Sequence, residues 1–171
     1  MSAAVIFDID GTLVDSVDLH ARAWQEAFRH FGRDVPFQSI RHQIGKGGDQ
    51  LLPEFFSKDE LEHFGKELED FRGKLYKKNY LPQVKAFPQV RELFTRLAAD
   101  KKKIALASSA KQDEVKVYKQ IARIEDLVQA ETSKDDVEKS KPHPDIFAVA
   151  LQKLGLDATQ VIAVGDTPLR C

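Results

Sequence analysis

Short apolar runs alternate with amphipathic stretches along most of the chain. Apolar runs rich in β-branched residues predict strands over residues 4–9, 103–107, 127–130 and 160–164. Apolar positions at helical spacing predict helices, over residues 88–100, 112–123 and 144–154. Strands that alternate with helices in this way predict an α/β fold, with a Rossmann-like parallel sheet core and helices on both faces.

The stretch between the first two predicted strands has a different pattern. Residues 16–84 carry no strand signal, and apolar side chains recur at helical spacing in 21–31 and 61–80. These apolar positions are Trp24, Ala27, Phe28, Phe31, Phe64, Leu68, Phe71 and Leu75. We therefore expect a helical cap over residues 16–84, inserted into a catalytic core made of residues 1–15 and 85–171.

Composition narrows the kind of protein. The chain has 171 residues, of which 42% are hydrophobic and 31% charged, so it can bury a core. A net charge of −1 gives no electrostatic footprint for nucleic acid or an anionic membrane. The sequence shows no signal peptide and no apolar run long enough to span a bilayer. The single cysteine, Cys171, suits a reducing compartment, so we expect a cytoplasmic protein without nucleic-acid or membrane partners.

The first predicted strand ends in two carboxylates, Asp8 and Asp10. Side chains two residues apart on a strand point the same way, so both acids project together. The next two residues, Gly11 and Thr12, turn the chain and can offer backbone N–H groups to an anion. Because adjacent carboxylates repel, the pair predicts a divalent metal and a phosphoryl group at this strand end. The alternative is an Asx turn in an acidic loop.

The second apolar strand ends at Ser108. Its hydroxyl, together with the N–H groups of Ser109 and Ala110, suits the oxygen of a phosphate group. The alternative is that the two serines cap the helix that follows, and both roles can hold at once.

Two later motifs place charged groups near strands and turns. Pro142 and Pro144 fix the backbone ahead of a helix and aim Lys141 in one direction, although a solvated lysine is the alternative. The last predicted strand ends in Gly165 and Asp166, so a further carboxylate lies at the end of a strand.

Together, the four motifs resemble those of the haloacid dehalogenase-like (HAD) hydrolase superfamily, in its phosphoglycolate phosphatase and β-phosphoglucomutase-like branch. The resemblance covers nearly the whole chain. It implies that Asp8 is a nucleophile that forms an aspartyl-phosphate and that Asp10 is the general acid and base. It also implies that Ser108 contacts the phosphoryl group and that Lys141 offsets its charge and that of Asp8. The implied cofactor is Mg²⁺, held by Asp8, the main-chain carbonyl of Asp10, and Asp166.

Substrate choice is expected to lie in the cap. Lys46, in the glycine-rich turn 45–49, could meet an anionic substrate tail, with a mobile solvated lysine as the alternative. His20 aligns with a histidine of β-phosphoglucomutase-like relatives, and a solvated or helix-packed imidazole is the alternative. Further polar candidates in this region are Arg41, His42, Arg72 and Lys74.

The function implied by the resemblance is that of a magnesium-dependent phosphatase acting on a small phosphorylated metabolite. Dehalogenation is disfavoured, because relatives with that activity lack the acid found here as Asp10. A sugar phosphomutase is one alternative, although the loop around Gly48 lacks the arginine expected there. The other alternative is a catalytically weak binding or regulatory protein.

The sequence departs from the family pattern after Asp166. Arg170 stands about where relatives carry another acid, and the sequence ends at Cys171 where they continue with a helix and a strand. We therefore expect that the C-terminal part of the core is missing, that metal binding is weakened, and that apolar surface is exposed. The expected state is a monomer or a weakly self-associating protein.

Overall fold

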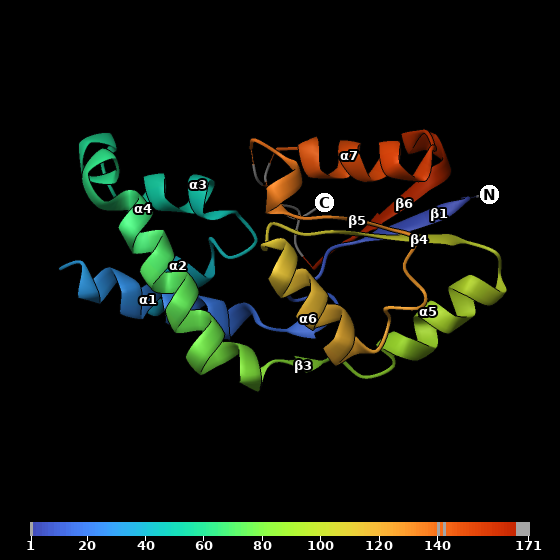
Figure 1. Ribbon diagram of the computed structural model, residues 1–171, viewed down its shortest axis with the longest axis horizontal. Helices are drawn as coiled ribbons and strands as arrows, with labels where there is room; N and C mark the ends of the chain where they lie inside the picture. The colour runs from blue at the N-terminus through green and yellow to red at the C-terminus, as the bar shows by residue number, and fades with distance from the viewer. Residues whose placement is uncertain (1, 140, 142, 167–171) are drawn as a thin grey trace.

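A four-stranded parallel sheet organises one lobe of the computed structural model, which describes residues 2–139, 141 and 143–166 (Figure 1). Its strands, in spatial order, are β5 (Ala130–Thr132), β4 (Lys103–Ala107), β1 (Ala4–Phe7) and β6 (Val161–Val164). The chain's first strand is therefore central, paired with β4 on one side and β6 on the other. The predicted α/β fold is confirmed.

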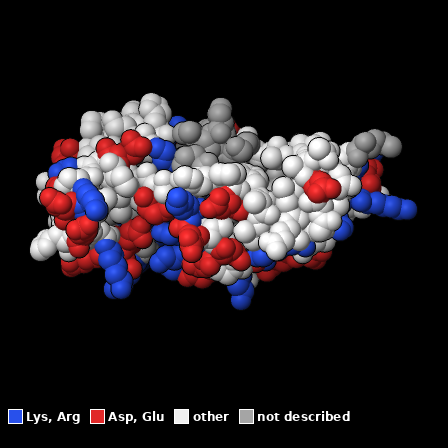
Figure 2. Space-filling view, turned by 90° about the horizontal axis from the view of Figure 1, so that it is seen from above, with Lys and Arg blue, Asp and Glu red and all other residues white. Residues whose placement is uncertain are grey.

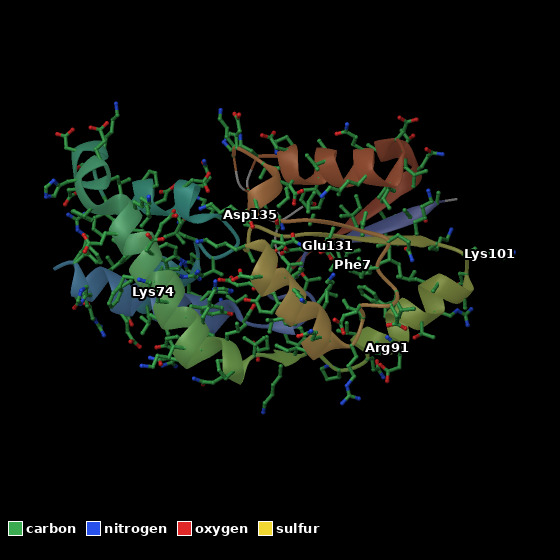
Figure 3. The ribbon with its side chains drawn as sticks, in the orientation of Figure 1. Phe7, Lys74, Arg91, Lys101, Glu131 and Asp135 are labelled. Atoms are coloured by element: carbon green, nitrogen blue, oxygen red, sulfur yellow. The ribbon has the colours of Figure 1, made fainter. Side chains whose placement is uncertain are left out.

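Alternate residues of β1 face opposite layers of helix. The core-lobe helices are α5 (Val90–Ala99), α6 (Gln112–Ala122) and α7 (Asp145–Leu154), with single turns η4 (Lys134–Asp136) and η5 (Ala158–Gln160). Ala4 and Ile6 share a buried cluster with α7, whereas Val5 and Phe7 share one with α5 and α6 (Figures 1 and 3). The period of two along the strand thus buries both faces of the sheet.

Strand β5 begins later than the sequence pattern predicts. Its pairing starts with Ala130 opposite Ala105, whereas we expected a strand over residues 127–130. Leu127 and Val128 pack against the cluster beneath the sheet. Their apolar character therefore reflects side-chain burial in the preceding turn and not pairing in the sheet.

The other lobe is helical. Its elements are α1 (Val17–His30), α2 (Phe37–Arg41), α3 (Gly48–Leu51), η1 (Leu52–Glu54), α4 (Lys58–Leu75), the π-helical η2 (Tyr76–Tyr80) and η3 (Leu81–Gln83). Helices α1 and α4 pack through apolar faces that include Trp24, Phe28 and Leu68. Helix α4 begins with a capping box, in which Ser57 and Glu60 satisfy each other's backbone N–H groups.

A short antiparallel ribbon connects the lobes. Strand β2 (Val14–Asp15) pairs with β3 (Lys85–Ala86), so the outgoing and returning connections lie side by side. The cap boundaries that we propose, residues 16 and 84, fall directly beside this ribbon.

The surface is mixed in charge and carries one exposed apolar edge. Figure 2 shows acidic and basic side chains intermingled on the face that it presents. In the described part of the chain β6 is terminal in the sheet, and its Ile162 is 51% exposed. Among the described residues, no helix combines the length and apolarity needed to cross a membrane.

Candidate active site

The predicted site residues gather at one edge of the sheet. Asp8 and Asp10 follow β1, Ser108 follows β4, and Asp166 follows β6. Hydrogen bonding continues just past the strand ends, since the Asp8 N–H donates to the Val164 carbonyl at 2.9 Å. Because all four strands are parallel, their carboxyl ends meet at this edge, where such sheets bind ligands.

Asp8 and Lys141 form a buried ion pair. The Lys141 Nζ lies 2.5 Å from Asp8 Oδ1 and donates a second hydrogen bond to the Ala107 carbonyl at 2.9 Å. Burial raises the pKa of Asp8 to about 6; the Lys141 ammonium opposes this rise, and the nearby charge of Asp10 adds to it. Asp8 Oδ2 is buried and has no hydrogen-bond partner among the described residues. Lys141 thus holds Oδ1 of Asp8, and Oδ2 is available to bind a metal ion or attack a substrate.

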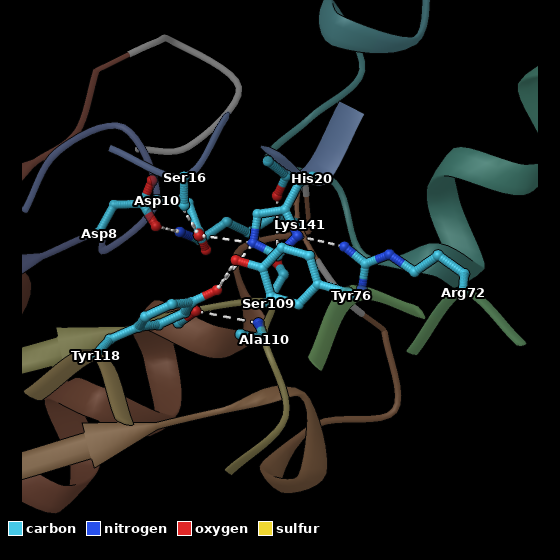
Figure 4. A network of polar contacts seen from close by, with 12 residues as sticks. Asp8, Asp10, Ser16, His20, Arg72, Tyr76, Ser109, Ala110, Tyr118 and Lys141 are labelled. Carbon is cyan, nitrogen blue, oxygen red and sulfur yellow. Dashed lines mark hydrogen bonds and ion pairs between the residues drawn. The ribbon is translucent and has the colours of Figure 1, made fainter. Parts of the chain in front are cut away.

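Asp10 is oriented by donors from the start of the cap. The Ser16 hydroxyl donates to Asp10 Oδ1 at 2.5 Å, and His20 Nε2 lies 3.0 Å from the same oxygen (Figure 4). His20 Nδ1 contacts the guanidinium of Arg72. A guanidinium only donates hydrogen bonds, so Nδ1 must accept, and the ring proton is assigned to Nε2. His20 therefore donates to Asp10 through Nε2.

Two buried tyrosines extend this network into the core lobe. The Tyr118 hydroxyl lies 3.0 Å from His20 Nε2 and 2.6 Å from the Tyr76 hydroxyl. The Tyr76 ring also stacks on His20, with ring centroids 4.0 Å apart. Burial raises the pKa of both tyrosines, so they remain neutral. Sequence reasoning missed both, because each stands at an apolar position; the available signal was that a buried phenol requires a partner.

We expected the backbone N–H groups of Gly11 and Thr12 to face an anion, but both donate to carbonyl groups of the chain itself. The Gly11 N–H donates to the Val14 carbonyl at 2.9 Å, and the Thr12 N–H donates to the Ile9 carbonyl at 3.2 Å. Both close the turn after β1, which Gly11 allows with a φ of 77°. The Thr12 hydroxyl, in contrast, is buried without a partner among the described residues.

Ser108 and Ser109 sit at the site but do not cap the following helix. The Ser108 hydroxyl accepts the Ala110 N–H at 3.0 Å, and α6 begins after Lys111 without a side-chain cap. The helix-cap alternative is therefore wrong. The Ser109 hydroxyl donates to the Gly45 carbonyl at 3.3 Å, which links the core to the cap loop.

A cavity of about 60 Å³ lies between the two lobes, next to Asp8 and Asp10. Asp8 and Asp10 line it from the core, whereas His20, Lys46 and Arg72 line it from the cap. His20 is only 6% exposed, so the solvated-imidazole alternative is wrong. The Lys46 side chain is 13% exposed and pairs with Glu54 at 2.8 Å, so it is not a mobile solvated lysine either.

The remaining polar cap candidates lie elsewhere. Arg41 forms an ion pair with Asp18 at 2.6 Å on the surface, and His42 is exposed. Lys74 is an exposed residue of α4 (Figure 3). The structure therefore brings only Arg72 of these four to the cavity.

The oxygen groups at the strand ends fit a hard divalent cation. Asp8 offers a buried oxygen that has no partner in the described part of the chain, and Asp166 follows the strand next to that of Asp8. No cluster of three or more His, Cys, Asp or Glu side chains suited to a metal occurs among the described residues. The set implied for Mg²⁺ needs only two such side chains and a carbonyl. Arg170 and Cys171, where the sequence departs from the family pattern, lie outside the described residues.

Comparison with known families identifies the class of protein. Residues 5–170 match the family described as haloacid dehalogenase-like hydrolase. The chain belongs to this family, and the prediction that it is a hydrolase of the phosphatase type is confirmed.

Individual relatives support the same branch. The chain is 33% identical over 167 residues to a phosphoglycolate phosphatase from Yersinia pestis, covering 95% of this chain and 72% of that protein. It is 27% identical over 168 residues to a phosphorylated carbohydrates phosphatase from Thermotoga maritima, covering 96% and 76%. Among solved structures, a hydrolase from Pseudomonas syringae superposes with a TM-score of 0.86 at 26% identity, covering 99% of this chain and 77% of that one.

Proposed function

We propose that the protein hydrolyses phosphate monoesters of small metabolites through an aspartyl-phosphate on Asp8. The observation that carries this proposal is the environment of Asp8: one oxygen is bound by buried Lys141, and the other has no partner among the described residues. The relatives named as phosphatases of phosphoglycolate and of phosphorylated carbohydrates support a small phosphorylated substrate.

In the first step, the Asp8 carboxylate attacks phosphorus, and the bond between phosphorus and the leaving oxygen breaks. Asp10 donates a proton to that oxygen, which leaves as an alcohol. In the second step, Asp10 accepts a proton from water as the water attacks the aspartyl-phosphate. Inorganic phosphate is released and the Asp8 carboxylate is restored.

The surrounding side chains prepare these steps. Lys141 balances the negative charge of Asp8 and of the phosphoryl oxygens from a site that water cannot reach. Ser16 and His20 both contact Oδ1 of Asp10, which orients the carboxylate for proton transfer. When bound by Asp8, the Asp10 carbonyl and Asp166, Mg²⁺ would supply further positive charge to the phosphoryl oxygens.

Contacts between the lobes keep water from the reacting groups. Lys77 of the cap pairs with Asp113 of the core at 2.5 Å, and Lys134 of the core lies 3.4 Å from Glu69 of the cap. A cap held in this way excludes bulk water while the phosphoryl group is transferred.

Hydrolysis is favoured over phosphomutase activity by the cap loop. A phosphomutase needs a cap that holds a bisphosphate, and the loop around Gly48 lacks the arginine expected there for that role. A side chain at the position of Gly48 would meet the carboxylate of Glu69.

The test is substitution of the two aspartates. Asp8→Asn preserves shape but removes the attacking charge, so magnesium-dependent hydrolysis of an aryl phosphate should fall below detection while the circular dichroism spectrum is unchanged. Asp10→Asn should slow breakdown of the intermediate and let phosphorylated protein accumulate in an intact-mass measurement. Glu92→Gln, an exposed change of similar chemistry on α5, is the control. Wild-type turnover by Asp8→Asn would overturn the covalent mechanism.

A further inference from the structure

A second cavity lies next to the cavity beside Asp8, farther along the cleft. The second also measures about 60 Å³ and lies between α4 of the cap and the start of α6 in the core. The two cavities share the wall residues Trp24, Gly48, Arg72, Ser109, Ala110 and Glu114. A substrate whose phosphate lies at Asp8 would therefore extend past this wall into the second cavity.

Glu114 is a buried acidic residue on the wall that the two cavities share. The residue lies in the first turn of α6 and is only 3% exposed, yet its carboxylate forms no hydrogen bond or ion pair with the described part of the chain. The positive end of the helix tolerates the negative charge there. A buried carboxylate without donors is nevertheless costly, so the site favours a ligand that donates hydrogen bonds.

The basic residues around Glu114 are already engaged. The ammonium groups of Lys77 and Lys134 pair with Asp113 and Glu69, respectively, and the charge of Glu114 acts on Lys77 in addition to that of Asp113. Arg72 binds His20 through one terminal nitrogen and lies over the Trp24 ring at 4.8 Å, but its buried Nε has no acceptor among the described residues. Within the described residues, the shared wall thus combines a hydrogen-bond acceptor without donors, the Glu114 carboxylate, and a donor without an acceptor, the Arg72 Nε–H.

A hydroxyl group can bind both side chains, because it can donate a hydrogen bond to the Glu114 carboxylate and accept one from the Arg72 guanidinium. A carboxylate in the same place would be repelled by Glu114. The Trp24 ring provides an apolar surface for the carbon skeleton of the ligand. We propose that the second cavity is a subsite for the hydroxylated arm of a sugar or polyol phosphate, with Glu114 and Arg72 selecting it over phosphorylated carboxylic acids.

This inference rests on the proposed phosphatase function, so the test uses substrates that separate the two. Glycerol 1-phosphate ends in a hydroxymethyl group, 3-phosphoglycerate has the same carbon chain and ends in a carboxylate, and ethyl phosphate has neither. We expect wild-type kcat/KM to be highest for glycerol 1-phosphate. Hydrolysis of ethyl phosphate that is lost in Asp8→Asn verifies the phosphatase function independently of the subsite.

The decisive variant is Glu114→Gln, which keeps the shape of the side chain and removes its charge. Hydrogen bonds to charged groups exceed neutral ones, so kcat/KM for glycerol 1-phosphate should fall about fivefold relative to ethyl phosphate, chiefly through KM. For 3-phosphoglycerate the same ratio should rise, because the repulsion is gone and the amide can donate. Glu92→Gln on α5 is the matched control and should change neither ratio.

Opposite changes for two substrates cannot come from general damage to the fold. A uniform change for all three substrates, or a wild-type preference for 3-phosphoglycerate, would overturn the subsite while leaving the phosphatase function intact. If Glu114→Gln lowers the melting temperature, Arg72→Lys provides a second measurement. It keeps the charge but removes Nε, and it should also lower the ratio of glycerol 1-phosphate to ethyl phosphate turnover.

Discussion

The charge on Asp8 is set by opposing influences within a few ångströms. Burial raises its pKa to about 6 despite the ammonium of Lys141. Only the ionised carboxylate attacks phosphorus, so turnover at subsaturating Mg²⁺ should fall as the pH drops through this value. Added Mg²⁺ should move the midpoint to lower pH, because a nearby cation favours the carboxylate.

A pH–rate profile with an aryl phosphate at two Mg²⁺ concentrations measures this effect. Asp18→Asn, a change in an exposed acid of α1, should leave the midpoint unchanged. A midpoint that is independent of Mg²⁺ would assign the titration to another group.

Residue types at strand ends could be predicted, whereas the partners that orient them could not. Asp8, Asp10 and Lys141 stand in short motifs whose backbone geometry is local, so their places in the site follow from the sequence. Tyr118 contacts His20, which is 98 residues away in the chain and itself contacts Asp10. That contact depends on how two helices of different lobes pack, which no local pattern encodes.

At the scale of single elements, a capping box stabilises the start of helix α4. The Ser57 hydroxyl accepts the Glu60 N–H, and the Glu60 carboxylate accepts the Ser57 N–H. Replacing a serine cap by alanine costs about 1 kcal/mol, so Ser57→Ala should lower the free energy of unfolding by about that amount. Urea denaturation measures the loss, and Ser39→Ala, in a short helix without a side-chain cap, is the control.

The same element predicts a dependence of stability on pH. The hydrogen bond from the Ser57 backbone holds the pKa of Glu60 below its usual value. Its stabilisation is therefore present above the pKa of the unfolded chain and is lost as pH falls through the lower folded value. The difference in stability between wild type and Glu60→Gln, which removes the charge that this hydrogen bond stabilises, should shrink in that acidic range.

Helices and central strands were predictable as elements, because burial on one face leaves a clear period. Strand β4 matches its predicted span of residues 103–107, since both faces of that strand are buried. Strand β5 was misplaced because Leu127 and Val128 are apolar for a different reason, as packing residues of a turn. Composition alone does not distinguish the two causes.

At the scale of the whole molecule, the exposed edge of the sheet predicts weak self-association. Strand β6 is terminal among the described strands, and Ile162 is 51% exposed. An exposed apolar edge favours pairing with a second chain, so Ile162→Lys should reduce the dimer fraction seen by sedimentation velocity. Leu93→Lys removes an exposed leucine from helix α5 and should have little effect. Equal effects of the two changes would assign any association to general hydrophobicity.

The ribbon of β2 and β3 limits how the cap can move. Val14 pairs with Ala86 and Asp15 with Lys85, so a bend in one connection forces the same bend in the other. Independent twisting of the two connections would break these backbone hydrogen bonds. The two connections are therefore expected to deform together when the cap moves relative to the core. Fluorophores placed on α1 and on α4 should consequently report a single shared rate constant for opening, even though the two helices enter the cap from opposite ends of its sequence.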